Sequence, residues 1–428
     1  MQLVIIADDL TGANDSAAYL RQCGFSARVM IYPFEQSLDY SGEVLVLDSE
    51  SRDLPVEEAR AAVASACDYI QSIAPTAIIY KKVDSTLRGH IGAELETLMD
   101  KLQLPRALFA PAFPQAGRTT VNGRQLLHGI PLELTELAHI PKSPVTTSDI
   151  AQILSQDTHI ITTQLALNSK FPSHQLVERS LVSKQVLIAD VKVADDLIKL
   201  AQEAVKLMPC VLVGSAGLAG ALTHSSLLPL KAKQDIKTPS LAPVKRLLIL
   251  SGSISAVSQE QCQLLIKETA CKVFKLDPQG ALTNPQAEAL RLASCIQKTA
   301  ATSDCVLVSG ALSPTDVSTC RQVAQEMQLS FFTAGECFAK TMAALMKICA
   351  ADFDGYVMTG GDTAVHACRA VQATTLELQG EIETGIAACT IAAGPLHGRI
   401  LVSKAGAFGR AQTFLHIYRT LTMHQARK

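Results

Sequence analysis

Short apolar runs alternate with helical patterns along almost the whole chain, and this alternation restricts the fold more than any other feature. In the first half, runs rich in Val, Ile and Leu occur at 3–8, 27–32, 44–49, 77–82, 107–112, 159–164, 186–191 and 210–215. Continuous apolar runs of this length are typical of strands that are buried on both faces of a sheet. Between two of them, segment 56–73 has Ala, Glu and apolar residues at helical spacing. The alternation predicts an α/β fold built on a parallel sheet with right-handed crossovers.

The alternation stops at 229–245, where three prolines and several lysines occur without apolar periodicity. Such a composition is typical of a linker. Further apolar runs then follow at 246–253, 272–277, 304–310, 329–334, 355–361 and 399–409. We therefore predict two α/β domains, residues 1–230 and 245–428, each with a largely parallel sheet flanked by helices, and a ligand cleft between them. The chain has 428 residues, of which 48% are hydrophobic, so it can fill two cores.

Charge, cysteine spacing and the N-terminus exclude several classes of function. A net charge of −2 gives no general attraction for nucleic acid or for an anionic membrane. The twelve cysteines form no C-x-x-C pair, and no Cys/His cluster has zinc-ligand spacing, so we expect reduced thiols and no metal held by protein ligands alone. The N-terminus lacks a basic signal region, and no run reaches ~18 apolar residues, so we expect a cytoplasmic protein.

Two acids, Asp8 and Asp9, stand where the first predicted strand ends. Open parallel sheets bind ligands just beyond the carboxyl ends of their strands, so this is a favourable place for chemistry. Neighbours on an extended backbone point in opposite directions, so at most one acid is expected to face a given substrate atom. We favour Asp9, which lies further into the loop, with Asn14 as the cap of the next helix. The alternative is that Asp8 caps the turn or pairs with a lysine.

Two further strand ends carry charged side chains. Arg52 follows one run, and a guanidinium can bind a carboxylate through two parallel hydrogen bonds, although a solvated surface arginine is the alternative. The sequence KKVDSTLRGHIG follows another run and contains Lys82, Asp84 and Ser85. There the cations would bind the carboxylate of a polyhydroxy acid and the acid would bind its hydroxyls. The alternative is an ordinary helix start capped by Ser85 or Thr86.

Three Gly-rich turns follow strands in the second half: SGSIS (251–255), TGGDTAVHA (359–367) and SKAGAFG (403–409). Glycine lets backbone N–H groups approach a ligand closely, and such turns form anion-binding concavities. Three of them in one domain predict a phosphate or nucleotide site, with ordinary turn glycines as the alternative. None has the Walker A pattern.

A competing motif is GSAGLAG at 214–220, which follows a predicted strand and resembles a dinucleotide-binding turn. Its spacing is G-x-x-G-x-x-G rather than G-x-G-x-x-G, and the Pro/Lys segment comes next instead of a second strand ending in an acid. A nicotinamide-dependent dehydrogenase is therefore a rival interpretation. A second rival is a sugar-acid sensor without catalysis, which would need the cationic pocket but none of the three Gly-rich turns.

The motifs ADDLTGAND, KKVDSTLRGHIG, GSAGLAG, SGSIS, GGDTA and SKAGAFG, in this order, resemble the four-carbon acid sugar kinase family. The resemblance extends from Ala7 to Gly409. It implies a two-domain α/β kinase that binds a tetronic acid in its N-terminal domain and ATP in its C-terminal domain, and phosphorylates the terminal hydroxyl. The KKVDSTLRG form is more similar to D-threonate and D-erythronate kinases than to 3-oxo-tetronate kinases, so D-threonate is the first expectation and the other two remain alternatives.

The resemblance also implies roles for individual residues. It implies substrate contacts for Asp9, Arg52, Lys82, Asp84 and Ser85. It implies ATP contacts for Ser253, Gly360, Gly361, Asp362, Thr363 and Gly406.

These roles suggest a mechanism, which we state as a hypothesis. Arg52 and Lys82 would bind the substrate carboxylate, and Asp9 would take the proton of the distant hydroxyl as general base. Mg²⁺ would bridge the phosphates of ATP, mostly through water, with Asp362 as a carboxylate contact. The expected partners are a small sugar acid and ATP, and the sequence also allows a homo-oligomer.

Overall fold

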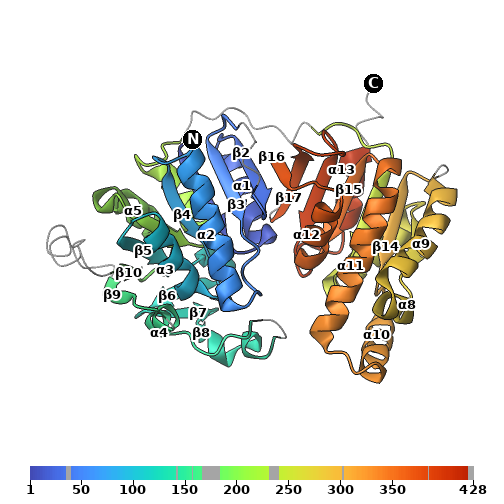
Figure 1. Cartoon of the computed structure of the whole chain (residues 1–428), viewed down its shortest axis with the longest axis horizontal. Coiled ribbons are helices and arrows are strands. Elements are labelled where there is room, and N and C mark those ends of the chain that lie inside the picture. The colour runs from blue at the N-terminus through green and yellow to red at the C-terminus, as the bar shows by residue number, and fades with distance from the viewer. Residues whose placement is uncertain are drawn as a thin grey trace. The chain divides into compact units, whose positions relative to one another are not determined.

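A computed structural model describes residues 1–34, 40–140, 143–156, 158–165, 184–230, 241–300, 303–383 and 385–422 (Figure 1). The chain divides into two compact units, residues 1–235 and 236–428, and each contains largely parallel strands. The two-domain α/β architecture is therefore confirmed. Most of the predicted linker, residues 231–240, lies outside the described residues. The domain limits at 230 and 245 and the cleft remain predictions.

Unit 1 contains a parallel sheet with the strand order β2-β3-β1-β4-β11-β5-β10-β9. Its strands are β1 (Leu3–Ala7), β2 (Ala27–Ile31), β3 (Val44–Asp48), β4 (Ile78–Lys82), β5 (Arg106–Ala110), β9 (Ile161–Leu165), β10 (Gln185–Ala189) and β11 (Val211–Gly214). These are the eight strands predicted from the first-half apolar runs. Every residue of β1 and β3 is buried, as continuous Val, Ile and Leu runs require.

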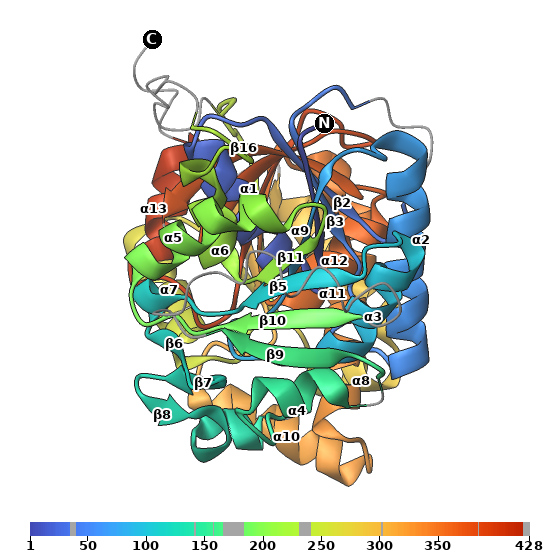
Figure 2. The same cartoon turned by 90° about the vertical axis from the view of Figure 1, so that its left-hand side faces the viewer.

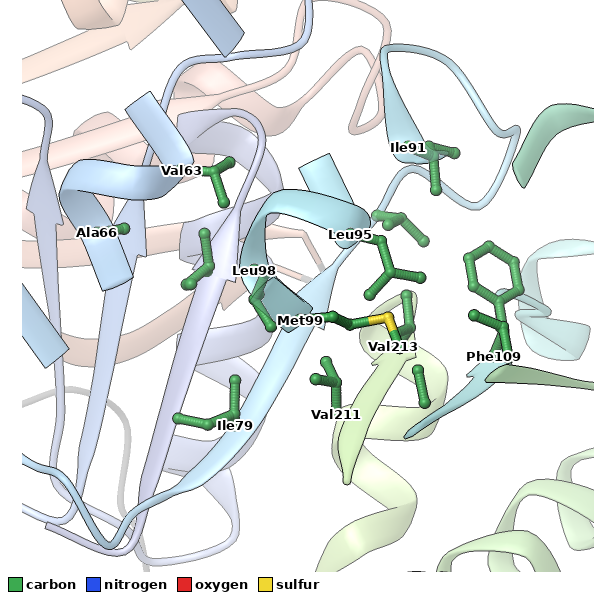
Figure 3. Close-up of a cluster of buried hydrophobic side chains, with 14 of the residues drawn as sticks. Val63, Ala66, Ile79, Ile91, Leu95, Leu98, Met99, Phe109, Val211 and Val213 are labelled. Carbon is green, nitrogen blue, oxygen red and sulfur yellow. The ribbon is translucent and has the colours of Figure 1, made fainter. Parts of the chain in front are cut away.

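Helices cover the sheet of unit 1 in two groups. They are α1 (Leu10–Gln22), α2 (Val56–Ile73), α3 (Ile91–Lys101), α4 (Ile150–Ser155), α5 (Ala194–Ala204) and α6 (Ala216–Ala221). Helix α2 has the bounds predicted from its spacing and contacts α3, which contacts α4, whereas α6 contacts α1 and α5 (Figure 2). Figure 3 shows side chains of α2 and α3, such as Val63 and Leu98, packed with strand residues such as Ile79 and Val213 in one hydrophobic cluster.

A small antiparallel sheet in unit 1 was not predicted. It consists of β6 (Arg118–Val121), β7 (Arg124–Leu127) and β8 (Ile130–Pro131). These strands are short and polar, so they lack the apolar runs on which the sequence prediction depended.

Unit 2 has the strand order β13-β14-β12-β15-β18-β17-β16. Its parallel strands are β12 (Leu247–Ser251), β13 (Lys272–Lys275), β14 (Cys305–Ser309), β15 (Gly355–Thr359) and β18 (Ile400–Lys404). The antiparallel strands β16 (Thr375–Glu383) and β17 (Ile386–Ile391), which were not predicted, extend the sheet beyond β18. The helices are α7 (Ala256–Glu268), α8 (Pro278–Thr283), α9 (Pro285–Ala300), α10 (Pro314–Glu326), α11 (Phe331–Cys349), α12 (Gly361–Ala370) and α13 (Thr413–Thr422).

The strand predicted at 329–334 is wrong, because this segment forms the start of α11. The hydroxyl of Ser330 accepts a hydrogen bond from the Thr333 amide and caps the helix. The side chains of Phe331 and Phe332 are each 44% exposed, whereas a strand inside the sheet would bury them. A short apolar run does not distinguish a strand from a helix start by itself.

Both units share a topology that singles out one edge of each sheet. The chain leaves β1 to form β2, returns to β3 beside β1, and then crosses to β4 on the other side of β1. In unit 2, β12, β13, β14 and β15 repeat this path. Such a reversal of direction creates a crevice at the carboxyl end of the first strand, where open α/β sheets bind ligands.

Within the described residues, no helix combines the length and hydropathy needed to cross a bilayer.

Candidate functional site

The register of the sheet brings three of the predicted strand ends in unit 1 together. Ala7, at the end of β1, pairs with Asp48 of β3 on one side and with Lys82 of β4 on the other. The loops that begin at these residues carry all five predicted substrate contacts. The topological crevice of unit 1 therefore coincides with the charged cluster expected from the sequence.

Arg52 lies between the two adjacent acids of this cluster. Its Nε and Nη2 atoms donate to the Asp8 carboxylate, at 2.9 Å each, and its Nη1 and Nη2 atoms donate to Asp9, at 2.6 and 2.7 Å. The two carboxylates meet although they are neighbours in sequence, because a guanidinium has more than one donating edge. Four of its five N–H groups are thus used, so the expected bidentate clamp on a substrate carboxylate would require release of one acid.

Asp9 also begins the first helix. Its carboxylate accepts a hydrogen bond of 2.9 Å from the Gly12 amide, and its own backbone is extended, as an N-cap requires. The predicted cap, Asn14, is wrong, since this residue is buried inside α1. The helix starts earlier because the acid that follows the strand can satisfy the first amides itself. Asp9 is therefore held from two sides, by a cation and by a helix N-terminus.

The two lysines of β4 face opposite sides of the sheet. Lys81 is fully buried and pairs with Glu94 of α3 at 2.7 Å. Lys82 points the other way, toward α1, where a Cβ placed on Gly12 would lie 2.8 Å from its Nζ and 2.7 Å from Asp9 Oδ1. The absence of a side chain at Gly12 leaves the Lys82 ammonium and the Asp9 carboxylate open to the same small space.

Asp84 closes the cluster with its own pair of partners. Its carboxylate accepts hydrogen bonds from Thr86 Oγ1 at 2.7 Å and from the Arg88 Nε. The Ser85 carbonyl accepts one from Gln125 Nε2 at 2.7 Å. Neither Ser85 nor Thr86 caps α3, whose N-cap position is His90. The alternative of an ordinary capped helix start is therefore excluded for this segment.

Burial and charge act against each other on the ionisable groups of this cluster. Burial alone would raise the pKa of Asp8, but Arg52, Lys81 and Lys82 together lower it. Burial would also raise the pKa of Asp84, but Arg88 and Arg52 hold it below its usual range. Both acids are thus ionised at neutral pH and neutralised by nearby cations.

Asp15 is a member of this site that the sequence prediction missed. Burial raises its pKa and nearby Asp9 raises it further, while Lys82 acts in the opposite direction. Asp15 lies three residues after Gly12 on α1, so both belong to the same helix face. That spacing could have identified it if the helix had been predicted to begin at Leu10.

In unit 2 the three Gly-rich turns also meet at one edge of the sheet. Ser251 at the end of β12 pairs with Thr359 at the end of β15, and Thr359 pairs with Lys404 at the end of β18. The Gly252 amide donates to the Thr359 carbonyl at 3.0 Å, and the Gly360 amide donates to the Lys404 carbonyl at 3.1 Å. The turns are therefore bonded to one another at the topological crevice of this unit.

Two glycines allow these turns to approach closely. A Cβ on Gly252 would lie 1.9 Å from Thr363 Oγ1, and a Cβ on Gly406 would lie 2.3 Å from Ser253 Oγ. Gly360 precedes α12 with φ +98°, a conformation that favours glycine. The predicted nucleotide contacts are thus brought together by contacts in which a larger residue would clash.

Helix α12 starts at this edge with the exposed residues Gly361 and Asp362, followed by buried Thr363. The first amides of a helix have no partner within it, and its N-terminus attracts anions. Among the described residues no cluster of three or more His, Cys, Asp or Glu side chains could hold a metal by itself. The backbone amides at this edge suit an anion such as phosphate.

The GSAGLAG segment serves packing instead of a dinucleotide. Ser215 caps the six-residue helix α6 and donates to the Ala112 carbonyl. A Cβ on Gly217 would lie 2.9 Å from the same carbonyl, and one on Gly220 would lie 2.4 Å from the Tyr19 ring. These glycines let α6 pack against its neighbours, so the dehydrogenase interpretation loses its main support.

Comparison with known proteins covers both units. A family model described as a sugar-binding N-terminal domain matches residues 3–222, and one described as a nucleotide-binding C-terminal domain matches residues 248–414. A D-threonate kinase of Salmonella typhimurium is 29% identical over 96% of each chain. A D-erythronate kinase of Heliobacterium modesticaldum is 25% identical over 96% of this chain and 94% of its own. A crystal structure of a Haemophilus influenzae protein, 22% identical, has the same fold, with a TM-score of 0.73 over 96% of this chain and 98% of its own.

Proposed function

Because this chain belongs to the four-carbon acid sugar kinase family, we propose that it transfers the γ-phosphoryl group of ATP to the terminal 4-hydroxyl of a four-carbon sugar acid, D-threonate first of all. One observation carries the proposal. The topological crevice described for unit 1 is lined by paired charges, and the one described for unit 2 is lined by bonded Gly-rich turns. A sugar acid suits the first and a polyphosphate suits the second.

The charged cluster of unit 1 supports recognition of a short carboxylate that carries hydroxyls. Lys82 would attract the substrate carboxylate, and the one N–H of Arg52 not used by Asp8 or Asp9 would add a hydrogen bond. The Asp84 carboxylate would accept hydrogen bonds from the hydroxyls, and the Ser85 hydroxyl would donate or accept them. This division of roles fits a substrate with one anionic end and several hydroxyls, such as a tetronate.

Asp9 is our candidate for the general base. Its carboxylate is partly exposed, whereas that of Asp8 is almost fully buried. The terminal hydroxyl of the substrate would donate a hydrogen bond to Asp9 and lose its proton to it as the oxygen bonds to the γ-phosphorus and the bond to ADP breaks. Arg52 would hold the carboxylate in the orientation that this proton transfer requires.

The turns of unit 2 would receive the nucleotide. Amides near Gly360, Gly361 and Gly406 would bind phosphate oxygens, with Ser253 and Thr363 beside them. Asp362, exposed at the start of α12, would contact a nucleotide-bound Mg²⁺ directly or through water, and that ion would supply charge neutralisation. Positioning and charge, more than covalent chemistry, then account for catalysis.

A coupled ADP-release assay with a panel of sugar acids tests this proposal. The purified full chain should release ADP when D-threonate is supplied with ATP and Mg²⁺, with lower catalytic efficiency for D-erythronate and 3-oxo-tetronate. Phosphorus NMR of the product should give a phosphate monoester on the terminal carbon. If no four-carbon acid stimulates ADP release from folded protein, the proposal fails. If D-erythronate or 3-oxo-tetronate is preferred, only the substrate assignment changes.

A further inference from the structure

A buried lysine of the SKAGAFG motif lies beneath the third Gly-rich turn of unit 2, and the mechanism above gives it no role. Lys404 is the last residue of β18 and is only 3% exposed. Its Nζ donates to the carbonyls of Ala405, Gly406 and Phe408, each at 3.0 Å. An ammonium has three N–H groups, so this set of carbonyls uses all of its donors.

No carboxylate pairs with Lys404 among the residues that the structure describes, which is unusual for a buried cation. Its charge is balanced by backbone dipoles and by the face of the Phe414 ring, whose centre lies 5.6 Å from Nζ. An ion that organises carbonyls in this way acts on the conformation of the loop from which they come.

The direction of the carbonyls fixes the direction of the amides. In a trans peptide the C=O and N–H groups point in opposite directions. The carbonyls of Ala405, Gly406 and Phe408 point at Lys404, so the amides of Gly406, Ala407 and Gly409 point away from it. No hydrogen bond among the described residues uses any of these three amides. The 405–409 loop therefore turns its unused donors outward on the side opposite the lysine.

We propose that Lys404 is a positioning residue that folds the 405–409 loop around its ammonium and so presents the Gly406, Ala407 and Gly409 amides to the β- and γ-phosphates of ATP. This inference rests on the proposed kinase function and adds a residue that acts through the loop, without touching the nucleotide. Buried positive charge behind the loop also favours an anion in front of it.

Two further contacts support a single, fixed loop conformation. The Gly406 carbonyl also accepts hydrogen bonds from Ser255 Oγ at 2.8 Å and Ser258 Oγ at 2.7 Å. Ser255 is the last residue of the SGSIS turn and the N-cap of α7, and Ser258 lies in the first turn of that helix. Burial lowers the pKa of Lys404 to about 8, so most of the lysine is charged at neutral pH. The Gly406 carbonyl, which Lys404 also binds, thus connects the SKAGAFG turn to Ser255 of the SGSIS turn.

The test is the variant Lys404→Met, which keeps the length and apolar stem of the side chain but removes the ammonium. Calorimetry should give a dissociation constant for ATP, and for inorganic triphosphate as a probe, that is ~10- to 100-fold higher than in the wild type. The dissociation constant for AMP, which lacks the β- and γ-phosphates, should change much less, and KM for the sugar acid should stay the same. Lys267→Met, an exposed site at the far end of α7, is the matched control.

Three results separate the outcomes. The inference would be overturned if folded Lys404→Met binds ATP as tightly as the wild type. It would also be overturned if the affinities for AMP and ATP fall by the same factor. If Lys404→Met does not fold, Lys404→Gln is the deciding variant, since an amide keeps two donors without the charge. Its affinity for triphosphate should then be lower than that of the wild type but still measurable. Wild-type protein that binds no ATP would instead count against the proposed function, whatever the variants do.

Discussion

The two crevices present different kinds of groups to an anion. In unit 1 the crevice is lined by side-chain charges that pair with one another, Arg52 with Asp8 and Asp9, while the buried Lys81 pairs with Glu94. In unit 2, the predicted contacts are mostly backbone amides on Gly-rich turns, and the buried cation, Lys404, is bound by carbonyls. The same strand order therefore supports two kinds of recognition.

The difference matches what each proposed ligand requires. A sugar acid has few charges and several hydroxyls, so specific side chains can distinguish it from similar acids. A triphosphate has many equivalent oxygens, which closely spaced amides bind without regard to the base. We therefore expect substitutions in unit 1 to affect sugar-acid turnover and substitutions in the unit 2 turns to affect nucleotide binding.

The largest effect is expected for Asp9→Asn. Loss of the general base should lower kcat by ~10²–10⁴, while the fold changes little because Asn is also a good N-cap. Steady-state kinetics with D-threonate, together with thermal unfolding, would measure both. Normal turnover in a folded Asn variant would refute the role of Asp9 and direct attention to Asp15.

Arg52→Lys should have the next largest effect. An ammonium cannot reproduce the four hydrogen bonds to Asp8 and Asp9, so Asp9 would lose its fixed orientation. We expect kcat/KM for the sugar acid to fall ~10- to 100-fold, with KM for ATP unchanged. Arg124→Lys, a half-exposed arginine of unit 1, is the matched control. A change confined to KM for ATP would break the division between the two crevices.

The pH dependence of stability tests the buried cation of unit 2. The pKa of Lys404 is about 8 in the folded protein and about 10.5 in the unfolded chain, so between these values the unfolded state binds more protons. The free energy of unfolding should therefore rise with pH across this window, by up to about 3 kcal/mol, relative to Lys404→Met. Chemical denaturation of both proteins at several pH values would measure this. The Cys262 thiol, whose burial raises its pKa to about 11, is the nearby group that also titrates. Equal slopes in the two proteins would contradict the prediction.

Gly406→Ala should have the smallest effect. The added methyl group would lie 2.3 Å from Ser253 Oγ, so the serine must move and one turn must shift slightly. Because of this overpacking, we expect KM for ATP to increase about 10-fold and KM for the sugar acid to stay the same. Gly335→Ala, where a Cβ meets nothing within 4 Å on α11, is the control and should stabilise the helix slightly. An unchanged KM for ATP in Gly406→Ala would argue against close approach of this turn to the nucleotide.

Local patterns allowed most of the fold to be predicted, because short windows of sequence indicate which strands are buried and which helices are amphipathic. The strand error at 329–334 arose where an apolar run of that length fits both structures, and exposure of Phe331 and Phe332 decided it. The antiparallel pair β16 and β17 was missed, because its pattern did not follow the strand and helix alternation.

The site could be predicted only as a set of residues, not as a set of bonds. The partners of Arg52 lie 43 and 44 positions away in the sequence, so no local pattern indicates that both acids bind it. Asp15 was missed because the start of α1 was predicted too late. The surroundings of Lys404 depend on how the loop after β18 turns back, which the motif SKAGAFG does not specify.

The two lysines at the end of β4 have a consequence for how related sequences are aligned. Their opposite orientations mean that Lys81 is a structural counter-ion of Glu94, whereas Lys82 faces the crevice at the end of β1, although both residues are lysines. A one-residue gap placed in this strand would exchange the two without changing the apparent match. In a relative with a single lysine here, a glutamate at the position of Glu94 would identify that lysine as the counterpart of Lys81 and not of Lys82.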